Sequence, residues 1–344
     1  MFFGSLLFIV ASQAEGAPAW PIRSVDRAAD GTLFGVSQRA LYRSRDGAAS
    51  WERLAEGENL GEVYVAADGG HALVIAHRGA RLWEGAETLW PVPLARAEPW
   101  IVTVWARAGK LWLASALEDP EDEETRDLLY TRDAPMISPG LHTLVLASLD
   151  EGRSWREIAA HGGALVRAGE LGADGVLRLC FSDGTLRGGG IDANDGELVD
   201  GALQLLSAPL QHLGSDEASW LLFPDARTGW VGGQRFFGGA DVARTSDGGR
   251  TWTELDAPAD EWIEAFRLGG GACVRVAGLW HPGARVELWR AGEFHELRRF
   301  EGEVHDARAD AGGGLLVRSK DGEVWRLSAD GGAWQRIGTI PVPK

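Results

Sequence analysis

A single eight-residue pattern, Ser/Thr-x-Asp-x-Gly-x-Ser/Thr-Trp, recurs along this chain and limits its possible folds more than any other feature. Residues 148–155 (SLDEGRSW) and 245–252 (TSDGGRTW) fit every position. Residues 44–51 (SRDGAASW) carry Ala48 where glycine is expected, and residues 328–334 (SADGGAW) are one residue shorter. A recurring pattern of this kind predicts a fold built from several copies of one small unit.

The pattern has the chemistry of a tight turn between two strands. The aspartate can accept N–H bonds within its own turn, glycine supplies the positive φ of a sharp reversal, and tryptophan opens the next strand. Because each position has a structural role, we interpret these aspartates as turn residues and not as catalytic acids. The predicted turn residues are Ser44, Asp46, Trp51, Ser148, Asp150, Gly152, Trp155, Thr245, Asp247, Gly249, Trp252, Ser328, Asp330 and Trp334.

The repeated turn resembles the Asp-box, or BNR repeat, of sialidases and many other β-propellers. With the turns as markers, residues 20–338 divide into seven units, which are 20–54, 55–96, 97–159, 160–206, 207–256, 257–298 and 299–338. Units of about 35–60 residues are in the range of propeller blades. The sequence therefore predicts an all-β fold, a single β-propeller of seven four-stranded blades. Six or eight blades are the alternatives, because the second, fourth and sixth units lack a clear copy of the turn.

Catalytic residues are not evident. The resemblance to sialidases implies a late tyrosine nucleophile, yet the three tyrosines, Tyr42, Tyr64 and Tyr130, all lie in the first half of the chain. Other propellers with this repeat hydrolyse polysaccharides with two carboxylates, and the 50 acidic residues leave that option open. We therefore expect a non-catalytic binding module with no assigned catalytic residue, and a glycoside hydrolase is the alternative.

One stretch resembles a particular group of propellers. Residues 223–233 (FPDARTGWVGG) and 243–252 (ARTSDGGRTW) are similar to the photosystem II assembly and stability factor family. The resemblance implies a non-enzymatic propeller that binds a partner protein, but it covers the fifth unit well and the others poorly. It favours a binding module for a protein or carbohydrate and leaves the partner open.

Composition excludes several other classes. A formal charge of −16 repels phosphate backbones, so no nucleic-acid partner is expected. No run of 18 apolar residues exists to form a membrane span. The eight histidines are scattered and residues 192–196 (DANDG) fit a turn better than a calcium loop, so no metal and no cofactor is predicted. Cys180 and Cys273 fall in apolar strands and are expected as buried free thiols in a monomeric protein.

The first residues carry a possible export signal. Residues 2–10 (FFGSLLFIV) are apolar and lead to small residues ending at Ala14, so residues 1–14 are predicted as a signal peptide. Export to the periplasm or the extracellular space would follow. No basic residue precedes Arg23, which leaves a terminal β-strand in a cytoplasmic protein as the alternative.

A candidate binding face follows from the propeller prediction. If the repeated turns join third and fourth strands, the loops between second and third strands open on the opposite face. Residues 117–140 form a long acidic loop of this kind in the third unit, and the fifth unit places two phenylalanines in the equivalent loop. We expect these loops to share one face, where acidic groups attract a basic partner and aromatic groups supply contact. The candidate residues are Glu121, Asp122, Glu123, Glu124, Arg132, Arg235, Phe236, Phe237 and His281.

Overall fold

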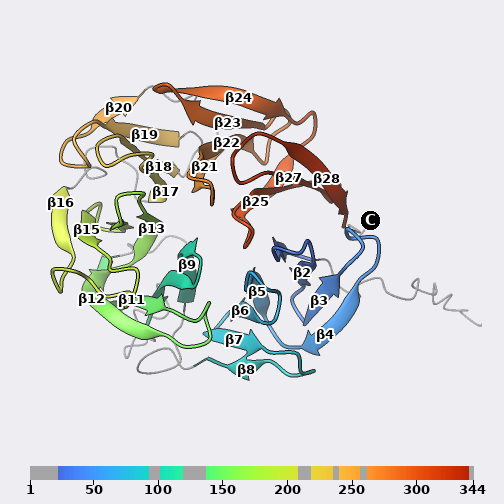
Figure 1. Cartoon of the computed structure of the whole chain (residues 1–344). Helices are drawn as coiled ribbons and strands as arrows, with labels where there is room; N and C mark the ends of the chain where they lie inside the picture. The colour runs from blue at the N-terminus through green and yellow to red at the C-terminus, as the bar shows by residue number, and fades with distance from the viewer. Residues whose placement is uncertain are drawn as a thin grey trace, which may run out of the picture.

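Seven four-stranded antiparallel sheets form blades around a central axis in the computed structural model (Figure 1). The structure describes residues 22–92, 101–118, 137–207, 218–234, 240–255 and 262–340. The fold is therefore an all-β, seven-bladed β-propeller, and the predicted fold class and blade number are confirmed. The predicted signal peptide lies outside the described residues.

Each blade consists of four strands that follow one another in the chain, with the first strand beside the axis and the fourth at the rim (Figure 1). The first three blades contain β1 (Ser24–Arg27), β2 (Leu33–Val36), β3 (Ala40–Ser44), β4 (Glu52–Glu56); β5 (Leu60–Val65), β6 (Ala72–Ala76), β7 (Ala80–Trp83), β8 (Trp90–Pro91); β9 (Ile101–Ala108), β10 (Leu111–Leu117), β11 (Ile137–Ser148) and β12 (Arg156–Ala164). The last four contain β13 (Val166–Leu171), β14 (Val176–Phe181), β15 (Leu186–Gly190), β16 (Gln204–Ser207); β17 (Ala218–Leu222), β18 (Gly229–Gln234), β19 (Ala240–Thr245), β20 (Thr253–Leu255); β21 (Trp262–Arg267), β22 (Cys273–Leu279), β23 (Arg285–Arg290), β24 (Glu293–Arg299); β25 (Val304–Ala309), β26 (Leu315–Ser319), β27 (Glu323–Leu327) and β28 (Trp334–Thr339).

Burial follows the position of a strand within its blade. Second strands such as β2 and β10 are buried at every position, while the outer strand β20 is exposed at every position. A second strand is covered on both faces by the neighbouring blades, so it consists of nearly continuous apolar residues. The two cysteines lie in such strands, and both are buried and unpaired, as predicted.

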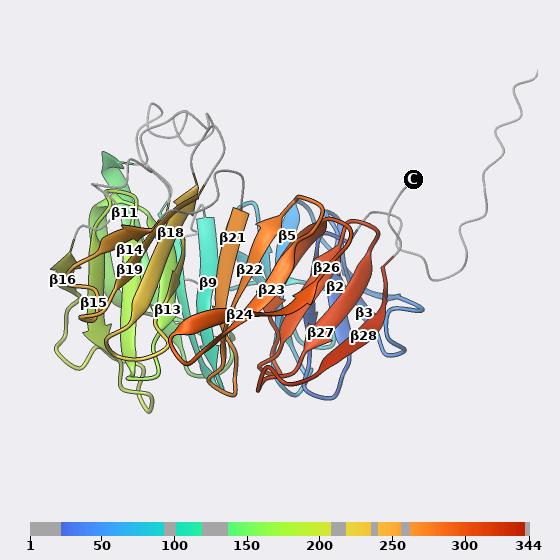
Figure 2. The same ribbon diagram turned by 90° about the horizontal axis from the view of Figure 1, so that it is seen from above.

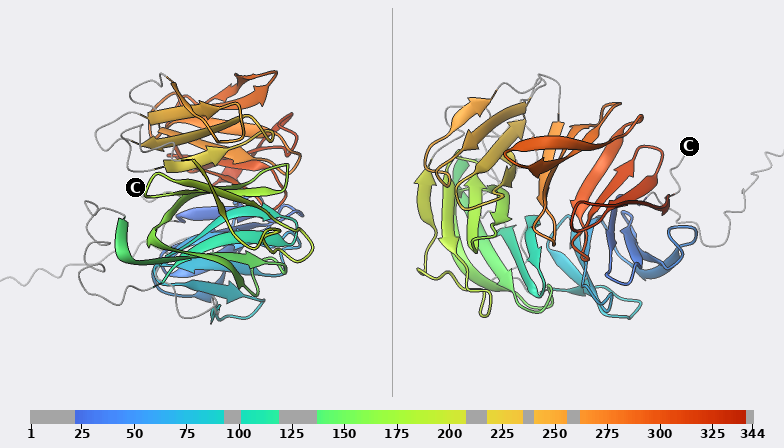
Figure 3. Two further views of the ribbon diagram at one scale, coloured as in Figure 1. Left: turned by 90° about the vertical axis from the view of Figure 1, so that its left-hand side faces the viewer. Right: turned by 45° about the horizontal axis from the view of Figure 1, so that its top comes forward.

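The first and last blades close the ring by side-chain packing. Each is complete within itself, so no strand is exchanged between them. Their shared core consists of Ile22, Val25, Leu33, Ala40, Tyr42, Ala48, Trp51, Leu316, Val324 and Ile340. Arg318 in the last blade also donates to the carbonyl oxygen of Arg23 at 3.1 Å. Figure 3 shows the blades following one another around the ring in chain order.

All four copies of the repeated turn join the third and fourth strands of their blades. They lie between β3 and β4, β11 and β12, β19 and β20, and β27 and β28. Because neighbouring strands are antiparallel, these turns share one face of the ring, and the loops between second and third strands lie on the other. Figure 2 shows the molecule from the side, with β9 and β21 running between these two faces.

Hydrogen bonds explain the residue pattern of the turn. In residues 148–155, Asp150 accepts from the Ser148 hydroxyl at 2.8 Å, the Ser154 amide at 2.8 Å and the Ser154 hydroxyl at 2.6 Å. The Trp155 indole donates to the Gly152 carbonyl oxygen at 3.0 Å. The first and third copies bind their aspartates in the same way. These carboxylates are held inside their own turns.

No helix that could span a membrane is found among the described residues.

Candidate functional site in the central channel

The propeller axis contains a cavity of about 1240 Å³, lined by the first strands of six blades. The lining includes charged side chains on β5, β9, β13, β21 and β25. First strands alternate between side chains that face the axis and side chains that pack between blades, so each can place a few polar groups in the channel. Most of these groups belong to two charged pairs that bridge blades, here called clasps, or to one less tightly paired cluster.

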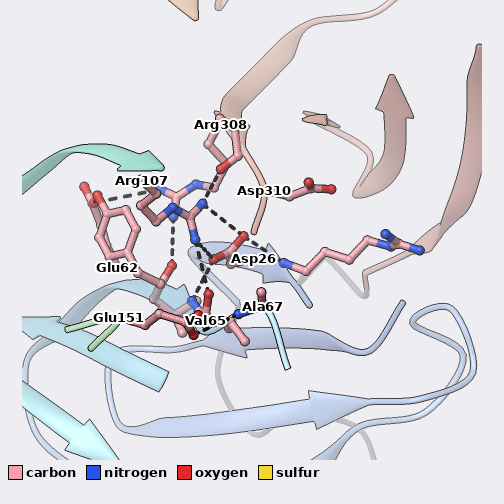
Figure 4. A network of polar contacts seen from close by, with 12 residues as sticks. Asp26, Glu62, Val65, Ala67, Arg107, Glu151, Arg308 and Asp310 are labelled. Carbon is pink, nitrogen blue, oxygen red and sulfur yellow. Dashed lines mark hydrogen bonds and ion pairs between the residues drawn. The ribbon is translucent and has the colours of Figure 1, made fainter. Parts of the chain in front are cut away.

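The first clasp joins three consecutive blades. Asp26 on β1 has no exposed surface, and its carboxylate accepts from the Val65 amide on β5 at 2.8 Å. The same oxygen accepts from Arg107 on β9 at 2.5 Å (Figure 4). Arg107 also donates to the carbonyl oxygen of Ala309 on β25. Asp26 and Arg107 therefore tie the first, second, third and last blades together.

The second clasp repeats this arrangement on the other side of the ring. Glu170 on β13 is 6% exposed and accepts from the backbone amide of Phe223, next to β17. It also accepts from Arg267 on β21, at 3.0 Å from Nε and 2.9 Å from Nη2. Burial raises the pKa of Glu170 to about 7, while Arg267 acts in the opposite direction.

The two clasps follow one rule. An acid on one blade accepts from a backbone amide of the next blade and from an arginine two blades on. Further hydrogen bonds offset the cost of enclosing such a charged pair. Here both arginines also donate to backbone carbonyl oxygens, and Nη1 of Arg267 is the one buried guanidinium nitrogen of the two pairs without a partner among the described residues. We interpret Asp26, Arg107, Glu170 and Arg267 as structural residues that fix the inner wall of the channel.

The third group of charges surrounds Arg308 on β25. Its guanidinium lies 3.9 Å from Glu62 on β5 and 3.9 Å from Asp306 on its own strand. Tyr64 donates its hydroxyl proton to Glu62 at 2.5 Å, and Arg308 lies over the Tyr64 ring at 5.6 Å. Figure 4 shows Glu62, Arg308 and the first clasp close together. Ion pairs at 3.9 Å are looser than the two clasps.

Glu264 on β21 is the fourth member of this cluster. It is half-buried and lines the cavity. No described residue makes a hydrogen bond or ion pair with its carboxyl group. Burial raises the pKa of Glu264 to about 8, the negative charge of Asp306 adds to that rise, and Arg308 opposes it. A carboxyl group with this pKa can hold a proton near neutral pH and lose it when a cation approaches.

Sequence patterns did not single out these channel residues. Glu170 and Glu264 are acids within mostly apolar first strands, which is the one available signal, and β1 (SVDR) gives no such signal for Asp26. Spacing could not show that Asp26 meets Arg107 or that Glu264 lacks a partner, because those facts depend on how the blades are placed around the axis.

A second polar group lies on the face of the repeated turns. Asp68, His71 and Glu151 place potential metal-ligating atoms within 4.8 Å of one another, although the sequence predicted no metal site. His71 Nε2 lies 2.9 Å from the Glu151 carbonyl oxygen, and the Glu151 carboxylate accepts from the Ala67 amide at 3.2 Å. These two contacts join the second and third blades, which gives the group a structural role.

Most of the predicted binding face lies outside the described residues. This applies to Glu121, Asp122, Glu123, Glu124, Arg132, Arg235, Phe236 and Phe237. The exposed His281 lies between β22 and β23, on the face opposite the repeated turns. Beside it, Trp280 is 49% exposed and packs on His305 with ring centroids 4.6 Å apart. That the acidic and aromatic loops act together stays a prediction.

No protein-family model and no curated protein matches the chain. The likeness of the repeated turns to Asp-boxes therefore stays a resemblance in sequence. Solved structures do match. A puromycin-hydrolysing peptidase of Mycobacterium tuberculosis is 14% identical over 94% of this chain, with a TM-score of 0.56. This chain spans only 55% of the peptidase.

Two further matches are similar in length to this chain. A structure of YCF48 bound to D1 peptide is 13% identical, with 89% of this chain and 92% of that chain covered and a TM-score of 0.50. The N-terminal domain of Nup159 is 12% identical, with 92% and 89% covered and a TM-score of 0.51. At such identities the likeness shows the fold alone, which is a seven-bladed β-propeller similar to YCF48 and other propellers.

Proposed function

We propose that this chain is a non-catalytic binding propeller whose partner is a protein that contacts the channel. The observation that carries the proposal is the cavity of about 1240 Å³ on the axis, with its wall fixed by interblade bonds. Asp26 and Glu170 are each engaged by a backbone amide and an arginine, so they are unsuited to exchange protons with a substrate. A preformed concave surface with a few fixed polar groups is typical of a binding site.

The comparisons support this direction. The YCF48 structure contains a bound peptide, and another similar chain comes from the Mitotic Checkpoint Complex, with a TM-score of 0.54 at 10% identity. Fold likeness does not transfer a partner, since one fold serves many functions. The likeness does favour protein recognition over catalysis as the first function to test.

A glycoside hydrolase is the second candidate, and Glu264 favours it. A general acid needs a carboxyl group that stays protonated near neutral pH, beside a second carboxylate that stays ionised. Burial raises the pKa of Glu264 to about 8, and the negative charges of Asp306 and Glu62 add to that rise. A buried carboxyl group with a raised pKa is compatible with catalysis. The same raised pKa is also expected for a buried carboxyl group whose role is to bind a cation.

Selection from a random-peptide display library tests the proposal. We expect the folded, immobilised protein to enrich peptides that free protein displaces, and the heat-unfolded protein to enrich none of them. Failure to enrich any displaceable peptide would contradict protein recognition.

Hydrolysis assays test the alternative with the same protein. Sialosides and a panel of polysaccharides are incubated with the wild type, with Glu264→Gln and with Glu301→Gln. Glu301 is exposed and serves as a charge-matched control. We expect no hydrolysis by any of the three proteins. Turnover that disappears in Glu264→Gln and persists in Glu301→Gln would replace binding with catalysis.

A further inference from the structure

Three arginines that lie on the strands around Glu264 are engaged by other acids. Arg107 pairs with Asp26, and Arg267 pairs with Glu170. Arg275, on the strand next to β21, is bonded to Glu287. Each of these arginines is therefore engaged away from Glu264.

The remaining cluster contains one more acid than it has arginines. Arg308 lies 3.9 Å from both Glu62 and Asp306, and Arg318 lies 4.0 Å from Asp306. Two guanidinium groups thus compensate two carboxylates. The carboxyl group of Glu264 is the third acid, and it has no hydrogen-bond or ion-pair partner among the described residues. Once Glu264 is ionised, one monovalent cation would balance its charge.

The cavity and its position allow a side chain to supply that cation. Glu62, Glu264 and Asp306 are each the third residue of a first strand, and all first strands run in the same direction. They therefore lie at a similar depth, in the half of the channel nearer the face that carries Trp280 and His281. A volume of about 1240 Å³ is ample for a long side chain.

The surroundings of Glu264 fit an organic cation better than a metal ion. A divalent ion takes several oxygen ligands, but Glu62 already accepts the Tyr64 proton and Asp306 is flanked by two arginines. Phe266 lines the cavity two residues beyond Glu264, so the two side chains point to the same side of β21. An aromatic ring beside a carboxylate suits the apolar stem and charged end of lysine or arginine.

We propose that the channel binds a lysine or arginine side chain of a partner protein, with Glu264 as its counter-charge. This inference rests on the proposed binding function and names the chemistry of the ligand. The cation enters from the face opposite the repeated turns and takes the place left between Glu264, Glu62 and Asp306.

Proton release gives the proposal a distinctive pH dependence. The charged groups that act on Glu264 are Asp306 and Arg308 on β25 and Glu62 on β5, whose carboxylate accepts the Tyr64 proton. Glu264 is mostly protonated below pH of about 8 in the free protein, and a bound ammonium or guanidinium group favours the ionised form. Binding therefore releases a proton, and affinity rises by up to about tenfold per pH unit until the pKa is reached.

The experiment uses three short peptides that differ at one position. Each is an acetylated and amidated glycine peptide with a central lysine, a central acetyl-lysine or a central glutamate. Ligand-observed NMR titrations at low salt measure Kd for the full-length wild type, Glu264→Gln and Glu301→Gln between about pH 6 and pH 9. Glutamine resembles the protonated glutamic acid in shape, so the variant should fold, and its Tm is checked.

We expect the lysine peptide to bind the wild type and the other two peptides to bind at least about tenfold more weakly. Glu264→Gln should weaken lysine binding at pH 9 by about tenfold or more and remove its pH dependence, while Glu301→Gln changes Kd by less than about twofold. Equal binding of lysine and acetyl-lysine, or an unchanged Kd and pH profile in Glu264→Gln, would overturn the inference.

The same assays separate this inference from the proposed function. If display selection yields peptides without lysine or arginine that bind Glu264→Gln as well as the wild type, the cation site is wrong and protein recognition stands. If no peptide binds and a polysaccharide is cleaved, both proposals are wrong.

Discussion

Replacing Asp26 with alanine tests whether the interblade clasps hold the ring together. The Asp26 side chain has no exposed surface. Its carboxylate accepts from the backbone amides of Val65 and Arg27 and from the guanidinium group of Arg107. Its removal leaves the Arg107 guanidinium, whose side chain is 12% exposed, without a counter-ion. Breaking a buried pair by removing one partner costs about 3–5 kcal/mol, so we expect a loss of that size in the free energy of unfolding.

A surface ion pair supplies the matched control. Arg53 and Glu56 are 2.6 Å apart, but their side chains are 61% and 73% exposed. Solvent and salt screen such a pair, and its loss in Glu56→Ala should cost less than about 1 kcal/mol. Burial rather than ion-pair distance therefore sets the expected difference between the two variants.

Urea denaturation followed by tryptophan fluorescence measures both effects. The double variant Asp26→Ala, Arg107→Met adds a second test, because it removes the stranded charge together with its partner. We expect it to lose about 1–3 kcal/mol less than the sum of the single variants. A cost for Asp26→Ala no greater than that of Glu56→Ala, or strict additivity in the double variant, would refute the clasp.

Three further predictions concern burial. Burial raises the pKa of Glu264 from an ordinary value of 4.5 to about 8, so the folded protein loses stability relative to the unfolded chain as pH rises between these two values. The free energy of unfolding of Glu264→Gln should therefore equal that of the wild type near pH 4.5 and exceed it by a few kcal/mol at pH 9. Equal stability at pH 9 would contradict this. In Gly232→Ala, a Cβ atom would lie 2.2 Å from the Trp220 ring, so the free energy of unfolding should fall by about 3 kcal/mol or more, whereas Gly302→Ala, in open space, should leave Tm unchanged. Burial raises the pKa of the Cys180 thiol to about 12, so Ellman's reagent should label this thiol only after the protein is unfolded in urea. Rapid labelling of the native protein at pH 8 would contradict the burial of Cys180 in β14.

Local sequence predicted the propeller because the information lies within a few residues. The aspartates of the repeated turns bind groups no more than four residues away, as Asp150 does with Ser148 and Ser154. The turn marks the step from third to fourth strand wherever it occurs. Apolar runs such as Leu33–Val36 mark the second strands, which neighbouring blades cover on both faces. Together these signals locate the blades without any knowledge of the ring.

The channel could not be predicted in the same way because its contacts span whole blades. Asp26 meets Arg107 across 81 residues, and Glu170 meets Arg267 across 97. The tilt of the first strands and the width of the ring determine which charged side chains come into contact. Neither quantity can be read from the spacing of residues in the sequence. The sequence by itself therefore determined the blades and their turns, through short-range hydrogen bonds and apolar runs. Only the closed ring decided which charges are paired and that the carboxyl group of Glu264 faces the channel without a described partner.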